Sequence, residues 1–140
     1  QGPVVASHNN CRALVRHQRQ FDDDQIRAII SRDGVIGAAL DSWMLRPNWV
    51  RGSKDNLPAT LDDVVDHIDH ICQLAGNSNH VGIGSDLDGG FGLEQSPSDL
   101  DTIADLQCIG NILSKRGYKT ADVSAIMHGN WLERIRRAWG

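Results

Sequence analysis

Three residues with metal-binding side chains follow apolar runs in this sequence. His8 follows the run at 3–6, and Asp86 and Asp88 follow the Val/Ile/Gly run at 81–84. Imidazole and carboxylate groups are common zinc ligands. Each residue alone has an ordinary explanation, because Asp-x-Asp-Gly is frequent turn chemistry and a histidine at a strand end is often only hydrogen-bonded. Their shared position at the end of an apolar run favours a metal site.

Alternating apolar runs and amphipathic segments must position these residues. The apolar runs predict strands at 3–6, 35–40 and 80–85. Capping residues and apolar spacing predict helices at 22–34, 60–76 and 99–116, and shorter ones from Thr120 and Asn130. This order predicts an α/β fold with parallel strands. The carboxyl ends of such strands carry the chemistry, so His8 and Asp86 are expected at one edge of the sheet.

Other polar residues are weaker candidates. Arg19 follows His8 by eleven residues, and its guanidinium suits a substrate carboxylate, although an ordinary surface role is also open. His67 and His70 lie three apart on a predicted helix and could chelate a metal, but a solvated or capping role is expected for them. The segment 41–60 is predicted to be a long loop.

Composition narrows the class of protein. The chain has 140 residues, 40% of them hydrophobic, which suits a single domain spanning 1–140. A net charge of −4 without a basic stripe argues against nucleic acid as a partner. No run is long enough to span a membrane. The widely spaced Cys11, Cys72 and Cys108 are expected to be reduced and mostly buried.

Two other site types can be weighed against the segment 86–90. A calcium-binding loop would need a third oxygen ligand before its glycine, and Gly89 arrives too early. A magnesium-dependent phosphatase using Asp86 as nucleophile is a minor alternative, because a hydroxyl residue usually stands where Gly90 is found. A module that binds a small molecule or peptide without catalysis is a further alternative.

Several blocks, in order along nearly the whole chain, resemble the C-terminal part of the membrane dipeptidase (renal dipeptidase) family of zinc metallopeptidases, especially its bacterial members. The blocks are "PVVASHNNCRAL", "DDQIRAI", "GVIGAAL", "DDVVDHIDHICQLAG", "HVGIGSDLDGG" and "RGYKTADVSAIMHGNWLERI". The resemblance implies a (β/α)₈ barrel of the triosephosphate isomerase type, of which this chain would supply about three βα units and the C-terminal helices. It also implies hydrolysis of dipeptides at two bridged zinc ions.

The same resemblance implies roles for three residues. His8 is expected to bind one zinc ion, and Asp86 is expected at the other, near the substrate amine, as a catalytic residue. Arg19 is expected to bind the terminal carboxylate of the dipeptide. The family's other metal ligands precede the part that this chain resembles. The chain is therefore expected to lack a complete site and to pair with the missing N-terminal portion of the barrel, or to self-associate.

Overall fold

A three-stranded parallel sheet lies at the centre of the structure, a computed structural model that describes residues 4–140. The strands are β1 (Val5–Ala6), β2 (Val35–Ala38) and β3 (Val81–Ile83), with β2 in the middle. The register pairs Val5 with Val35 and Ile36 with Val81. An α/β fold with parallel strands is therefore confirmed. Residue 3, where the first strand was predicted to begin, lies outside the described residues.

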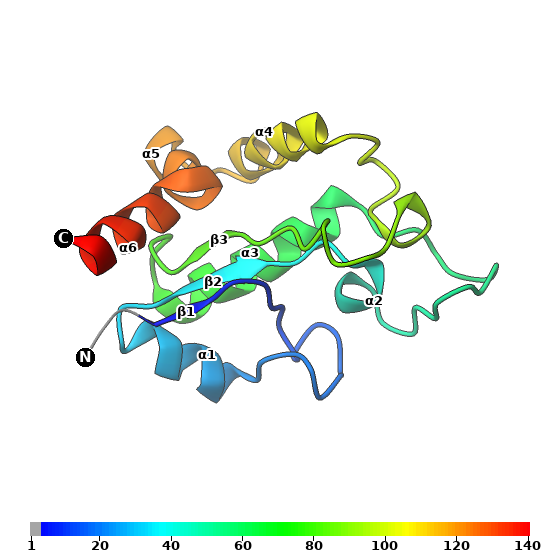
Figure 1. The fold of residues 1–140 in the computed structure, drawn as a ribbon, viewed down its shortest axis with the longest axis horizontal. Helices are drawn as coiled ribbons and strands as arrows, with labels where there is room; N and C mark the ends of the chain where they lie inside the picture. Colours follow the sequence, from blue (N-terminus) through cyan, green and yellow to red (C-terminus); the bar gives the residue numbers. More distant parts are fainter. Residues whose placement is uncertain (1–3) are drawn as a thin grey trace.

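Helices cover the sheet and connect its strands (Figure 1). They are α1 (Asp23–Ile30), α2 (Ser42–Leu45), α3 (Leu61–Ala75), α4 (Gln107–Lys115), α5 (Thr120–Ser124) and α6 (Asn130–Trp139). Short 3₁₀ turns stand at Leu93–Gln95 and Ile103–Leu106. Among the described residues, no helix has the length and apolar character needed to span a bilayer.

The core forms where α3 packs behind the sheet. Its buried residues recur at three- and four-residue steps, which is the spacing of one helix face. These residues are Val64, Val65, Ile68, Ile71 and Cys72, and they join Ile36, Ala38 and Val81 of the sheet in one apolar cluster. Burial of each such side chain contributes about 1.5–3 kcal/mol to the free energy of unfolding. The packing of α3 therefore holds the sheet to the rest of the fold.

Several predicted helix ends are confirmed by their capping contacts. Asp22 accepts a hydrogen bond from the Gln25 backbone at the start of α1, as the capping box predicted. Thr60 caps α3, and Gly76 ends it with a φ of 69°. Gly117, with a φ of 94°, follows the end of α4.

Other predicted boundaries were wrong. α1 ends at Ile30, four residues before Gly34. The segment predicted as a loop contains the single turn α2. The helix predicted to begin at Asp99 begins later, because the Asp99 carboxylate instead accepts the Leu61 N–H at the start of α3. The two predicted C-terminal helices form one continuous run, joined by a π-helical turn at Ala125–Gly129.

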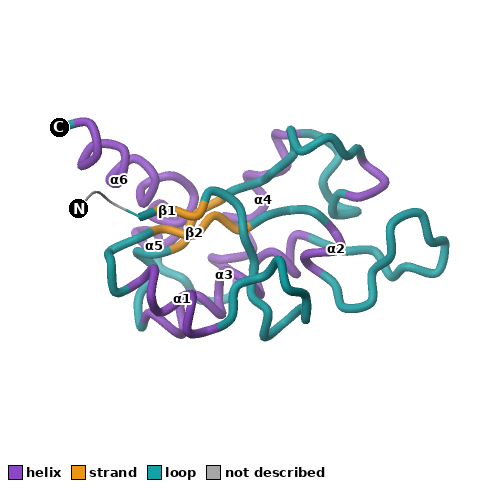
Figure 2. The backbone as a smooth tube through the Cα atoms, turned by 60° about the horizontal axis from the view of Figure 1, so that its bottom comes forward, coloured by secondary structure: helices purple, strands orange, loops and turns teal. Residues whose placement is uncertain are grey.

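Two glycines allow the strand ends to meet. A Cβ built on Gly37 or on Gly84 would overlap the carbonyl oxygen of Ser7. The same Cβ atoms would stand 2.8 Å and 2.9 Å from the Cα of the other glycine. Ser7, Gly37 and Gly84 therefore lie directly against one another, and the residues that follow them share one edge of the sheet. Figure 2 shows the loops of this edge extending away from the strands.

We expect Gly37→Ala to destabilise the fold, because the added methyl has to displace the β1 backbone at Ser7. Overpacking of this kind costs about 1–3 kcal/mol of unfolding free energy, which urea denaturation would measure. Gly110→Ala is the matched control, since its Cβ would meet Val123 Cγ1 at an ordinary 3.5 Å inside α4. Equal stability of the two variants would contradict the close approach at Ser7.

Candidate active site

The carboxyl end of β1 is held in place by two asparagines. The Asn9 N–H donates to the Gly37 carbonyl at 2.7 Å, continuing the strand pairing. Asn10 is buried, and its side-chain oxygen accepts the Ala39 N–H at 2.9 Å while its amide donates to the Ala39 carbonyl at 3.0 Å. The Asn10 side chain thus replaces a strand residue in the pairing. Sequence reasoning missed this role, because it treated these residues only as the end of the apolar run.

His8 follows β1 with one ring nitrogen engaged. Its Nδ1 lies 2.8 Å from the Ser7 hydroxyl oxygen. Histidines that bind metals commonly use one ring nitrogen for a supporting hydrogen bond of this kind and the other for the metal. The geometry of His8 therefore suits a metal ligand that binds through Nε2.

Arg19 lies beside His8. Its guanidinium donates to the His8 carbonyl oxygen at 3.3 Å, so the loop between the two residues folds back on itself. The loop is closed by Arg12 N–H, which donates to the Phe21 carbonyl at 2.7 Å. The Arg19 side chain is exposed and retains free donors for a ligand. Two of the three predicted site residues are thereby brought together.

Asp86 follows β3 at an irregularity of the sheet. Regular pairing, shown by Gly84 N–H donating to the Ala38 carbonyl, would bring the Leu40 N–H to Gly84. The Leu40 N–H instead donates to the Ser85 carbonyl at 3.1 Å, one residue further on. Asp86 has a φ of 58°, in the left-handed region that non-glycine residues rarely adopt. Bulges and backbone strain of this kind concentrate at functional sites.

The position of the Asp86 carboxylate requires that residue 89 carry no side chain. A Cβ on Gly89 would stand 2.8 Å from Asp86 Oδ1. Within residues 4–140 the carboxylate accepts no hydrogen bond, and the residue is half-buried. It is thus free to bind a cation, whereas Asp88 is exposed on the same turn.

His67 occupies a different position from the one expected. Instead of being solvated, it is only 1% exposed, and its Nδ1 accepts the Cys11 N–H at 3.0 Å. Its Nε2 has no hydrogen-bond partner in the described part of the chain. Burial lowers the pKa of His67 to about 4, so the ring is neutral and carries its proton on Nε2. His67 thus fixes the start of the Arg19 loop to α3.

His70, by contrast, pairs with Asp23 of α1 at 2.8 Å, so the two histidines are engaged in different contacts. Within residues 4–140, no group of three or more His, Cys, Asp or Glu side chains is close enough to hold a metal ion. The cysteines are free, with Cys11 and Cys72 buried and Cys108 exposed.

The pKa of His67 predicts how stability depends on pH. Between pH 4 and 6.5 the unfolded chain binds a proton that the folded chain excludes, so stability rises with pH across this window. The full effect is on the order of 3 kcal/mol. We expect His67→Gln to abolish this slope in unfolding experiments, whereas His128→Gln, at an exposed position, should keep it. An unchanged slope in the His67 variant would contradict this assignment.

Comparison with known proteins places these features in a family. Residues 1–138 match the family described as membrane dipeptidase (peptidase family M19). This chain therefore belongs to the M19 membrane dipeptidase family, as its sequence blocks indicated.

Individual relatives are longer than this chain. It is 33% identical over 137 residues to an uncharacterized protein in the pqqA 5′ region of Klebsiella pneumoniae, covering 98% of this chain and 47% of that protein. It is 31% identical to dipeptidase tcpJ of Claviceps purpurea, covering 96% of this chain and 29% of the relative. The chain thus spans less than half the length of these curated relatives.

The fold matches a solved metallopeptidase of Rhodobacter sphaeroides. The TM-score is 0.82 at 26% identity, and the match covers 99% of this chain and 37% of the peptidase. That peptidase was crystallised with a phosphinate mimic of the dipeptide L-Ala-D-Ala.

Proposed function

We propose that this chain is the C-terminal portion of a (β/α)₈ barrel that hydrolyses dipeptides with two zinc ions. The observation that carries the proposal is the position of His8 beside Arg19 at the strand ends, in a chain that belongs to a dipeptidase family. The match to a peptidase that binds a dipeptide mimic supports it. Residues 1–138, matched as one family region, are proposed to form a single unit with the last two residues.

Exposed surfaces of the sheet support the barrel. β1 and β3 form the two outer edges, and such edges readily pair with further strands. Beside β1, a largely apolar cavity of about 300 Å³ is lined by Val5, Trp131, Arg134, Ile135, Ala138 and Trp139. Val5 is 51% exposed and Trp139 86% exposed. The N-terminal portion of the barrel is proposed to cover this surface, and a second copy would cover it in the isolated chain.

His8 and Asp86 fit a site for two zinc ions, with His8 as a ligand of one ion and Asp86 at the other. His8 offers Nε2, and Asp86 offers a carboxylate that accepts no hydrogen bond from the described residues. Catalytic zinc sites use three protein ligands each, so the remaining ligands are proposed to come from the N-terminal portion. Bound zinc would supply a water of lowered pKa and polarise the peptide carbonyl.

The residues of this chain would select and orient the substrate. Arg19 presents a planar fork of donors that suits the terminal carboxylate of a dipeptide. Asp86 would accept a hydrogen bond from the substrate's ammonium group, in addition to its role at the metal. With the two ends of the substrate bound by opposite charges, the site would favour dipeptides over longer chains.

We expect His8→Ala in the complete enzyme to lower zinc content and dipeptide turnover together. Loss of a residue that only hydrogen-bonds to a metal ligand lowers metal affinity about 10- to 100-fold. Loss of a ligand itself should therefore lower zinc affinity at least about 100-fold. Zinc per protein would be measured by plasma mass spectrometry. His128→Ala, which changes an exposed histidine of the π-helical turn, is the control. Full zinc content and turnover in the His8 variant would show that His8 is not a ligand.

Substitution of Arg19 should affect substrate binding more than turnover. Arg19→Ala is expected to raise KM about 10- to 100-fold, the usual loss for a hydrogen bond to a charged group, with a smaller change in kcat. The exposed neighbour Arg16→Ala is the matched control. A dipeptide with an amidated C-terminus separates the explanations, since the Arg19 variant should lose the preference for the free carboxylate. A preference that survives the substitution would rule out this role.

A further inference from the structure

The proposed mechanism leaves one buried carboxylate at the strand ends unused. Asp41 follows β2 as His8 follows β1 and Asp86 follows β3, and it is only 6% exposed. Its Oδ2 accepts the Trp43 Nε1–H at 2.6 Å, and both of its oxygens lie 2.8 Å from the Gln95 side-chain amide. Burial raises the pKa of Asp41, and the hydrogen bonds from Gln95 and Trp43 oppose this rise only in part. Burying a carboxylate is costly, and the hydrogen bonds from Trp43 and Gln95 offset part of that cost.

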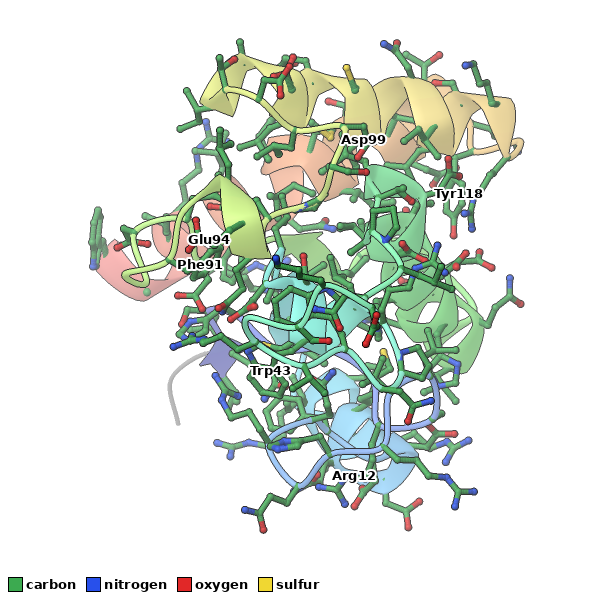
Figure 3. The ribbon with its side chains drawn as sticks, turned by 90° about the vertical axis from the view of Figure 1, so that its right-hand side faces the viewer. Arg12, Trp43, Phe91, Glu94, Asp99 and Tyr118 are labelled. Atoms are coloured by element: carbon green, nitrogen blue, oxygen red, sulfur yellow. The ribbon has the colours of Figure 1, made fainter. Side chains whose placement is uncertain are left out.

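The first of these contacts leads to the Arg19 loop. The Trp43 ring packs edge-on against His17, with 4.7 Å between ring centroids. His17 Nδ1 in turn accepts the Arg19 backbone N–H at 3.1 Å. Figure 3 views the molecule from the side where the strands end, and in it Trp43 lies between Arg12 of the first loop and Phe91 and Glu94 of the third.

The second contact leads to the segment that follows Asp86. Gln95 is buried, with 2% exposure, whereas its neighbours Leu93 and Glu94 are exposed. The segment 86–98 contains three glycines, which leave its backbone with wide conformational freedom. Its far end is fixed by Ser98 N–H, which donates to the Ala59 carbonyl at 2.8 Å. Between Asp86 and this point, Gln95 fixes the segment to Asp41, which follows the middle strand.

We propose that Asp41 is a positioning residue for dipeptide hydrolysis. It connects the Arg19 loop, through Trp43 and His17, with the Asp86 segment, through Gln95. Its contacts therefore set the separation between the group that would bind the substrate carboxylate and the group that would bind its amine. This inference rests on the proposed function, because the separation matters only if both groups hold one dipeptide.

The contacts of Asp41 can be partly preserved by substitution. In Asp41→Asn, the side-chain oxygen can still accept the Trp43 N–H, and the amide can donate to Gln95 once the Gln95 amide turns over. In Asp41→Ala both contacts are lost. A role in positioning therefore predicts that the asparagine variant recovers most of what the alanine variant loses.

The test uses the complete enzyme with L-Ala-D-Ala as substrate. We expect Asp41→Ala to raise KM about tenfold, the loss expected for a charged hydrogen bond, with kcat changed much less, and Asp41→Asn to recover most of the affinity. Hydrogen exchange of residues 86–98 should become faster in the alanine variant. Gln95→Ala should reproduce both effects, and the double variant should add little to either single one.

The control separates positioning from stability. Asn130 is also buried and donates to the Ser78 and Val81 carbonyls at 2.7 Å, at the opposite end of β3. Asn130→Ala should lower the melting temperature and leave KM unchanged. Unchanged KM and unchanged exchange of residues 86–98 in Asp41→Ala would overturn the inference. If the wild-type enzyme does not hydrolyse the dipeptide, the proposed function fails, while the exchange comparison still decides whether Asp41 holds the segment.

Discussion

The approach of the Ser7 carbonyl to Gly37 and Gly84 is the contact on which the rest of the site depends. It brings the ends of all three strands within van der Waals distance, which side chains at either glycine would prevent. Three residues with ionisable side chains follow these points closely: His8, Asp41 and Asp86. Their convergence thus begins with the backbone of the strands, and side-chain contacts such as those of Asn10 and Asp41 then hold the loops that follow.

Neutral hydrogen bonds hold the loops around this convergence. Asn10 completes the pairing of β2, and His67 accepts the Cys11 N–H as an uncharged ring. Contacts of this kind fix geometry in a partly buried environment with less desolvation than ion pairs require. The charges of Arg19 and Asp86 consequently remain available for a ligand. A site whose dipoles are fixed before the substrate arrives needs little reorganisation during the reaction.

The sequence was sufficient for the features that local chemistry decides. The parallel α/β order followed from apolar runs, and the caps Asp22, Thr60 and Gly76 followed from residue types. The structure also places Arg19 beside the His8 carbonyl, whereas its binding of a substrate carboxylate stays a prediction. The contacts of His67 and Asp99 could not be predicted from local sequence, because each side chain binds a residue distant along the chain. His67 accepts the Cys11 N–H, and Asp99 accepts the Leu61 N–H. Asp41 follows an apolar run as His8 does, but the tryptophans and prolines after it are typical of a loop, and its partner Gln95 is distant along the chain.

The π-helical turn at Ala125–Gly129 sets the rotation of α6 about its own axis. Such a turn holds one residue more than an α-helical turn, and each residue rotates a helix by about 100°. Trp131 lies just beyond it and donates its Nε1–H to the Ile83 carbonyl at 2.9 Å, three residues before Asp86. A one-residue deletion within the turn would rotate the indole away from β3. The number of residues in the turn therefore matters more for the position of Trp131 than their identity.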